Sequence, residues 1–162
     1  GNGSTLKLML GLLGSIINGN STLDGSDCLG YDVHQTILDS QDFGVPQRRR
    51  RVFIVGFKPP RRFQFPQGNG DSRKYFADIK ELRGDYSRYM MPRTPSRGKM
   101  ANECPILKDD AIASTLTTKN DRWRNAGLVP QGDWYRFLTE REMARLQGFP
   151  DSFKIVGTLQ AA

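Results

Sequence analysis

The stretch DFGVPQRRRRVFIVGF, residues 42–57, places four consecutive arginines directly before a run of β-branched and aromatic residues. That run predicts a β-strand over residues 51–57, with the extended chain beginning near Arg49. Side chains alternate between the two faces of a strand, so Arg49 and Arg51 project to one side and Arg48 and Arg50 to the other. Two guanidinium groups about 7 Å apart on one face can bind a phosphate and a carbonyl oxygen together.

The basic character extends beyond the four arginines. Seven basic residues and no acidic ones lie between positions 47 and 62: residues 48, 49, 50, 51, 58, 61 and 62. Gln47, at the end of the preceding loop, adds an amide that both donates and accepts hydrogen bonds. A structural alternative stays open, because charge on a solvated hairpin edge also discourages pairing between sheets.

The composition describes a globular chain with a basic balance. The 162 residues include 24 Lys and Arg against 17 Asp and Glu, a net charge of +7, and the mean hydropathy is -0.55. Such a balance suits nucleic acid, an anionic membrane surface or an acidic partner. The absence of a long apolar run and of a signal-like N-terminus predicts a soluble, intracellular protein without membrane spans.

The cysteines and the single histidine do not suggest a metal site. Cys28 and Cys104 lie far apart without CxxC spacing, which argues against a disulfide scaffold or a zinc site. His34 lies in YDVHQTIL, where the alternating pattern predicts an ordinary strand residue over 31–38. We therefore expect no bound metal.

Other segments predict a mixture of helix, strand and irregular chain. The opening STLKLMLGLLGSII, residues 4–17, predicts a short helix, and residues 18–30 predict a loop. The strands at 31–38 and 51–57 can lie antiparallel around the loop between them. From residue 58 to about 132 the chain is irregular, basic and aromatic.

The clearest local pattern lies in RFLTEREMARLQGFP, residues 136–150. Thr139 and Glu142 form a capping box at the start of a short helix, flanked by a hydrophobic staple of Leu138 and Met143. Gly148 predicts a left-handed C-terminal cap, and the proline at 150 prevents continuation. Arg141 and Arg145 fall on one helical face.

These two stretches resemble motifs of one family. DFGVPQRRRRVFIVGF resembles motif VIII of the DNA (cytosine-5) methyltransferases, with its Gln-x-Arg-x-Arg core, and RFLTEREMARLQGFPDSF resembles motif IX. The order is that of the family, with about 75 residues between the motifs where a target-recognition region lies. ILKDDAIASTLTT, residues 106–118, resembles the Thr-Leu core of that region, and TLQAA at 158–162 resembles the first residues of motif X.

The resemblance implies methyl transfer from S-adenosylmethionine to C5 of a flipped cytosine in double-stranded DNA. The family's Pro-Cys nucleophile, Glu-Asn-Val and Phe-x-Gly-x-Gly motifs have no counterpart in this sequence, and neither cysteine is interpreted as a nucleophile. The chain therefore resembles the C-terminal part of such an enzyme, a fragment or split subunit that is inactive without an N-terminal catalytic half or partner subunit. The cofactor site is expected to lie mostly outside this chain, and the location to be the cytoplasm of a bacterium, where a phage enzyme would also act.

The resemblance also implies roles for individual residues. Arg51 is expected to donate to the cytosine O2, and Arg49 to hold a phosphate or the nucleophile loop, with Gln47 beside them. The implied DNA contacts are Arg48, Arg50, Thr115, Leu116, Thr117, Arg122 and Arg124, with Trp123 assigned either to DNA or to the core. The motif IX residues with structural roles are Arg141, Glu142, Arg145 and Gln147.

The implied fold class is α/β. It combines the end of a Rossmann-like methyltransferase sheet (1–57), an irregular, mainly β target-recognition domain (58–132), and a motif IX helix with the start of motif X (133–162). Two alternatives stay open: a basic DNA-binding module without catalysis, and part of an RNA cytosine-5 methyltransferase. Recognition loops have no transferable code, so the DNA sequence read is not predicted.

Overall fold

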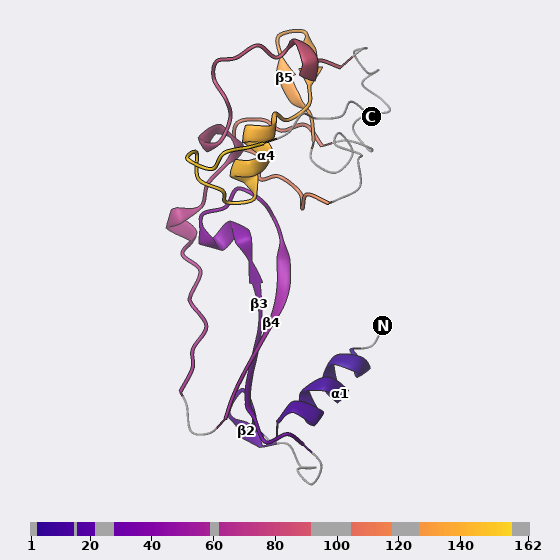
Figure 1. Cartoon of the computed structure of the whole chain (residues 1–162), viewed down its shortest axis with the longest axis vertical. Helices are drawn as coiled ribbons and strands as arrows, with labels where there is room; N and C mark the ends of the chain where they lie inside the picture. The colour runs from indigo at the N-terminus through magenta and orange to yellow at the C-terminus, as the bar shows by residue number, and fades with distance from the viewer. Residues whose placement is uncertain are drawn as a thin grey trace. The chain divides into compact units, whose positions relative to one another are not determined.

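The structure, a computed structural model, describes residues 3–14, 16–21, 28–58, 62–91, 105–117 and 127–156 (Figure 1). Contacts group the chain into two compact units. The first contains Gly1–Leu38 and Arg50–Gly68, and the second contains Asp39–Arg49 and Asn69–Ala162. Each unit is described by itself. The division into three functional parts at residues 57 and 132 stays a prediction.

The first unit opens with the predicted helix, which is shorter than expected. Helix α1 spans Ser4–Leu13 and ends at Gly14, whose backbone is extended. A side chain at Gly14 would place its Cβ 2.1 Å from the Tyr31 carbonyl oxygen, so only glycine allows this close approach. The prediction of helix through residue 17 was wrong, because the chain enters a strand immediately afterwards.

A four-stranded sheet forms the rest of the first unit, in the order β2-β1-β3-β4. Strands β1 (Ile16–Ile17) and β2 (Asn20–Ser21) are antiparallel, and β1 pairs with β3 in parallel. Asn18 and Gly19 between them both have positive φ, 51° and 79°. Asn-Gly favours this two-residue turn, so the region predicted as a loop begins with a tight hairpin.

The long strands of the sheet confirm the sequence prediction. Strand β3 spans Asp32–Asp39 and β4 spans Arg50–Phe57, and the two are neighbours in the sheet. Figure 1 shows them side by side and running in opposite directions. The connection contains the 3-10 helix η2 (Ser40–Phe43), which Gly44 ends with φ 77°.

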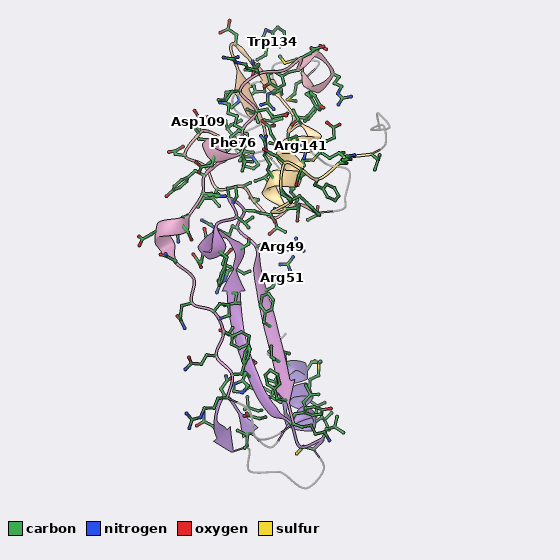
Figure 2. All side chains as sticks on the ribbon, turned by 60° about the vertical axis from the view of Figure 1, so that its left-hand side comes forward. Arg49, Arg51, Phe76, Asp109, Trp134 and Arg141 are labelled. Carbon is green, nitrogen blue, oxygen red and sulfur yellow. The ribbon has the colours of Figure 1, made fainter. Side chains whose placement is uncertain are left out.

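The second unit is mostly irregular in its described residues. Besides η2, it contains the 3-10 helices η3 (Gly70–Ser72), η4 (Phe76–Asp78) and η5 (Ser87–Tyr89). A hairpin of β5 (Val129–Gln131) and β6 (Trp134–Arg136) follows, in a register that pairs Val129 with Arg136. Figure 2 shows Trp134 on this hairpin. Helix α4 (Glu140–Leu146) comes last.

One hydrophobic cluster holds these irregular segments together. Its members are at most 5% exposed and come from five stretches of the chain: Phe76, Ile79, Leu107, Ala113, Val129, Leu138 and Leu146. Leu116 and Met143 pack against it. With little regular structure, the second unit depends on this burial of apolar surface for its stability.

Two further observations concern the described residues only. No helix among them has the length and apolarity that crossing a bilayer requires. No group of three or more His, Cys, Asp or Glu side chains among them is placed to hold a metal ion.

Candidate functional site

The four arginines lie where the loop after η2 enters β4. Arg50 and Arg51 begin the strand and are exposed, whereas Arg48 and Arg49 end the loop, Arg48 exposed and Arg49 half-buried. Position 51 is therefore inside an extended segment, as predicted. The boundary between the units falls between Arg49 and Arg50, so the shared orientation of Arg49 and Arg51 stays a prediction.

The charge of this segment is not neutralised within the described part of the chain. None of the four arginines forms an ion pair there, although five other basic residues do: Arg73, Lys80, Arg88, Arg136 and Arg145. The Arg51 Nη1 donates to the Arg50 carbonyl oxygen at 2.7 Å, an exposed contact. A guanidinium without a carboxylate partner keeps most of its five donors for an external anion or carbonyl group.

Gln47, which is 1% exposed, holds the loop that leads into the arginines. Its Nε2 donates to the Leu146 carbonyl oxygen at 2.9 Å, at the end of α4. The Ser40 hydroxyl donates to the Gln47 carbonyl oxygen, closing the loop from η2. The Gln47–Leu146 hydrogen bond connects motif VIII to the motif IX helix. Gln47 therefore positions the loop, in addition to its predicted place in the site.

Residues 113–116 run beside the loop, although they are 67 positions away in the sequence. Gln47 and Ala113 form a parallel bridge, with the Arg48 amide donating to the Ala113 carbonyl oxygen at 2.8 Å. The Thr115 hydroxyl donates to the Arg48 carbonyl oxygen at 2.7 Å, and the Arg49 Nη1 lies 3.5 Å from the Leu116 carbonyl oxygen. The structure thus brings the predicted Thr-Leu segment against the predicted arginine segment.

Asp39 orients the same loop from the strand side. Its Oδ1 accepts from the Arg49 amide at 2.9 Å, and its Oδ2 accepts from the Gln41 Nε2 at 3.1 Å. The backbone of Arg49 is therefore held by a carboxylate, while its guanidinium has no carboxylate partner among the described residues and donates only to the Leu116 carbonyl oxygen at 3.5 Å. Because their backbone is anchored on both sides within the second unit, the side chains of Arg48 and Arg49 start from fixed positions.

The capping box and the C-terminal glycine predicted for the motif IX helix are both confirmed. The Thr139 hydroxyl accepts from the Glu142 amide at 3.1 Å, and Glu142 Oε2 accepts from the Thr139 amide at 3.0 Å. Gly148, with φ 82°, is in the left-handed region just beyond α4. Leu138 is a member of the core cluster and Met143 packs against that cluster, and the direct contact of a hydrophobic staple between them stays a prediction.

Glu142 is fully buried and has a partner that the sequence analysis did not single out. The Arg136 guanidinium donates to both carboxylate oxygens, at 2.7 and 2.8 Å, and both side chains are 0% exposed. The Glu81 amide donates to Glu142 Oε1 at 3.0 Å, and the Tyr86 ring stacks 4.4 Å from the guanidinium carbon. The sequence contained one indication of this pair. Arg136 is the first residue of the motif IX stretch, close to Glu142, and a capping-box glutamate that becomes buried needs a cation as its partner.

The remaining motif IX residues are held at the rim of α4. Arg145 donates to both carboxylate oxygens of Asp151, at 2.7 and 3.1 Å, and to the Ile79 carbonyl oxygen at 2.9 Å. The Arg145 hydrogen bond lowers the pKa of the Asp151 carboxyl below its ordinary value. Arg141 donates to the Phe153 carbonyl oxygen at 3.0 Å, whereas Gln147 is exposed.

Other predicted residues cannot be placed with these. Arg122, Trp123, Arg124, Cys104 and the motif X segment 158–162 lie outside the described residues. Thr117 is described and exposed. Figure 2 shows the labelled Arg141 with Phe76 and Asp109 in the second unit.

The fold is shared with a methyltransferase of known structure. The crystal structure of S. pombe Dnmt2 methyltransferase matches with a TM-score of 0.58 at 21% identity, over 78% of this chain and 48% of that chain. At this identity the likeness concerns the fold alone, a mixed α/β arrangement with small sheets.

The sequence comparisons give the family. The C-5 cytosine-specific DNA methylase family matches residues 20–162, and the chain belongs to that family. Among its relatives are the Type II methyltransferase M.BsuFI of Bacillus subtilis, 32% identical over 159 residues, and M.HpaII of Haemophilus parainfluenzae, 31% identical over 184 residues. These matches cover 85% and 94% of this chain but only 37% and 48% of the relatives. The chain thus spans less than half the length of either relative.

Proposed function

We propose that this chain is the part of a DNA cytosine-5 methyltransferase that positions the target cytosine and reads the DNA, acting as a fragment or split subunit of an enzyme of the restriction-modification type. Family membership supports the reaction class. One observation supports the assignment of the site. The backbone of the arginine segment is anchored by Asp39 and Ala113, while none of its guanidinium groups pairs with a carboxylate among the described residues.

The reaction explains why fixed cations are needed. The C5 atom of cytosine is hidden in the base stack, so the base must leave the duplex to be methylated. Arg51 donates to the O2 of the flipped cytosine and stabilises negative charge that develops on the ring. Arg49 holds the adjacent phosphate or the nucleophile loop. Each such charge-assisted bond contributes about 1.5–3 kcal/mol.

The remaining predicted contacts serve the DNA backbone and the recognition of sequence. Arg48 and Arg50 bind phosphates, and Thr115, Leu116 and Thr117 lie near the flipped base in the proposed complex. Arg122 and Arg124 contact base edges or phosphates. Phosphate contacts fix the register of the protein on DNA, and base-edge contacts provide specificity. Residues 58–132 act as the target-recognition domain, and residues 1–57 form the end of a Rossmann-like methyltransferase sheet.

Glu142 and Arg145 support the site rather than touching the substrate, whereas Gln47 both lies beside the arginines in the proposed site and positions their loop. Gln47 links the arginine loop to α4. Glu142 and Arg145 hold α4 against the segment around residues 79–81. The recognition region is thereby attached to the arginine loop through hydrogen bonds within one unit.

The methyl group comes from S-adenosylmethionine, whose site we place mainly outside this chain. Two hollows in the described residues do not fit this cofactor, because neither has a glycine-rich loop at the end of a strand. They are lined by Asp32, His34, Arg62, Phe63 and Gln64, and by Glu81, Arg83, Gly84, Asp85, Tyr86, Ser87, Arg88, Tyr89 and Thr139. The nucleophilic cysteine likewise comes from the missing half. A cytoplasmic location follows from this function.

A complementation assay tests the proposal. The chain is mixed with the part of the Bacillus subtilis relative that lies outside its match to this chain, and transfer of labelled methyl groups to duplex DNA is measured. We expect transfer from the mixture and none from either part alone. DNA binding without transfer would favour a basic DNA-binding module, and transfer to RNA but not to DNA would favour an RNA enzyme.

A further inference from the structure

A hollow in the first unit is lined by side chains that the proposed function does not use. Two of them come from strand β3 and three from the segment that follows β4: Asp32, His34, Arg62, Phe63 and Gln64. All five belong to the same compact unit. The volume of the hollow is about 530 Å³, which is within the range of small-molecule sites in proteins.

A carboxylate on the wall of this hollow lacks a hydrogen-bond donor. Asp32 Oδ1 and His34 Nε2 are shielded from solvent and have no hydrogen-bond partner among the described residues. The two atoms lie 3.5 Å apart, which makes an ion pair only when His34 is protonated. The Asp32 side chain is 20% exposed, and its second oxygen is not among the shielded atoms. Because polar atoms in such places are nearly always hydrogen-bonded, this carboxylate indicates a ligand that supplies the donor.

The Phe63 ring adds a flat apolar surface to the same hollow. Its centroid lies 5.4 Å from the ring centroids of His34 and Phe57 and 4.9 Å from that of Phe65. These neighbouring rings hold its orientation, and Phe63 is only half-buried. Unpaired bases stack on aromatic side chains of this kind, so the ring suits a planar heteroaromatic ligand.

Arg62 and Gln64 bring polar groups to the hollow on either side of Phe63 in the sequence. Both residues are exposed, and neither forms an ion pair or a hydrogen bond with a described residue. A guanidinium group is complementary to a phosphate, and an amide both donates and accepts hydrogen bonds. A cationic ligand would be repelled by Arg62, whereas a ligand with a phosphate and a ring that carries N–H donors would satisfy all of these groups.

We propose that the hollow binds a guanine nucleotide, with the base toward Asp32 and Phe63 and the phosphate toward Arg62. An ionised carboxylate only accepts hydrogen bonds, and guanine presents two neighbouring N–H donors on its pairing edge. Adenine and cytosine place a ring-nitrogen acceptor beside their amino group, and the carboxylate would repel that acceptor. The Gln64 amide donates to the guanine O6, which lies beside the two donors. The inference goes beyond the proposed function and does not depend on it.

The ligand has two possible sources with the same chemistry. The edge of guanine that faces Asp32 is paired with cytosine in a duplex. The ligand is therefore a free nucleotide or an unpaired guanine in a nucleic-acid strand, which enzymes and binding proteins read by this edge and by stacking.

The single histidine of the chain provides a specific probe of the hollow. GMP, AMP and inorganic phosphate are titrated into the whole chain, and the NMR signal of the His34 Cε1–H group is followed. We expect GMP to shift this signal and to bind at least about tenfold more tightly than AMP, the value of one hydrogen bond to a charged group. Inorganic phosphate should leave the signal nearly unchanged.

Two variants test the assigned contacts. Asp32→Asn is expected to weaken GMP binding at least about tenfold and to remove the preference over AMP. Arg62→Gln is expected to weaken GMP binding roughly tenfold and to leave the binding of guanosine, which has no phosphate, unchanged. The matched control is Lys58→Gln, which removes a positive charge from an exposed residue of the same unit that does not line the hollow. Circular dichroism checks that each variant is folded.

The outcomes decide the inference. A His34 signal that does not respond to GMP overturns the site, and an equal affinity for GMP and AMP overturns the assigned base. Equal losses in Arg62→Gln and Lys58→Gln would show attraction to general positive charge and overturn the phosphate contact. A short single strand with one guanine among thymines separates the two sources: tighter binding than GMP supports an unpaired guanine of a strand, and weaker binding supports the free nucleotide.

Discussion

The Thr115 hydroxyl connects the predicted DNA-recognition segment to the segment that positions the arginines. The hydroxyl carries one hydrogen, which it donates to the Arg48 carbonyl oxygen at 2.7 Å. A phosphate accepts hydrogen bonds but cannot donate them, so a phosphate contact would compete for that same hydrogen. The family resemblance implies a DNA contact for Thr115, for which a phosphate is one candidate, and in the structure its hydroxyl donates to the arginine segment.

Replacing Thr115 by Val distinguishes these two roles. If the hydroxyl braces the arginines, Thr115→Val lowers the rate of methyl transfer in the complemented enzyme by roughly two- to tenfold, the value of one neutral hydrogen bond, with little change in the Kd for DNA. Thr115→Ser keeps the hydroxyl and should restore the rate. A rise in Kd with an unchanged rate would show that the hydroxyl serves a phosphate instead.

The elements differ in how far local sequence determines them. Helix α4 was predictable because the residues that begin and end it lie within its own stretch, from Leu138 to Gly148. Strands β1 and β2 were not predicted, because two isoleucines directly after a leucine-rich helix continue its apolar run. The Asn18–Gly19 turn was the indication that the chain reverses there.

The candidate site was predictable in its parts and not in its assembly. The arginine run and the Thr-Leu segment were each identified from the sequence, but the bridge of Gln47 to Ala113 joins residues far apart in the chain. The buried Arg136 likewise depends on a pocket made by Glu142, Tyr86 and the Glu81 amide. Contacts of this kind depend on tertiary packing, which local propensity does not encode.

The Arg136–Glu142 pair should dominate the stability of the α4 region. Each carboxylate oxygen accepts from Arg136 and from one backbone amide, so removal of either partner leaves a buried charge unpaired. We expect Arg136→Met or Glu142→Leu to lower the free energy of unfolding by about 3–5 kcal/mol each. The double variant should lose much less than the sum.

Chemical unfolding followed by tryptophan fluorescence measures these values, since Trp134, one of the two tryptophans, lies on the hairpin that carries Arg136. The control is Arg88→Met, which removes an ion pair to Glu140 from a side chain that is 67% exposed and should have little effect. Additive losses in the double variant would show that the two side chains contribute independently.

The Arg145–Asp151 contact predicts a pH-dependent stability. Arg145 lowers the pKa of the Asp151 carboxyl from its ordinary value of 3.8. A carboxyl whose pKa is lower in the folded state stabilises the fold above its unfolded pKa, and loses this effect as the pH falls through the folded pKa. Asp151→Asn should therefore lower the Tm near pH 7, and the difference from the parent chain should vanish once the pH falls below the lowered pKa of Asp151 in the folded chain.

Thermal unfolding at a series of pH values checks this expectation. Asp110→Asn makes the same charge change at an exposed residue that forms no ion pair with a described side chain, and should show no such pH dependence. An Asp151→Asn deficit that is the same at every pH would mean that the contact acts through packing.

At the scale of the whole molecule, the chain supplies only some of the functional groups of the proposed enzyme. In that proposal it supplies cations for the base and the DNA backbone and a recognition region, while the nucleophile and the cofactor site belong to the rest of the enzyme. The anchored arginine loop in the second unit is the feature through which it would serve that reaction.

The central claim is that Arg51 acts on the flipped cytosine, and the complemented enzyme tests it most directly. The measurement compares single-turnover methyl transfer and the Kd for DNA in Arg51→Ala with the same values in Arg50→Ala, its exposed neighbour on the strand. Loss of one charge-assisted bond in the transition state predicts a roughly 10- to 150-fold slower transfer for Arg51→Ala, with a Kd changed by less than about threefold. Arg50→Ala should weaken DNA binding and leave transfer at saturating DNA nearly unchanged. Parallel losses of rate and affinity in both variants would contradict the account and reduce Arg51 to a phosphate contact.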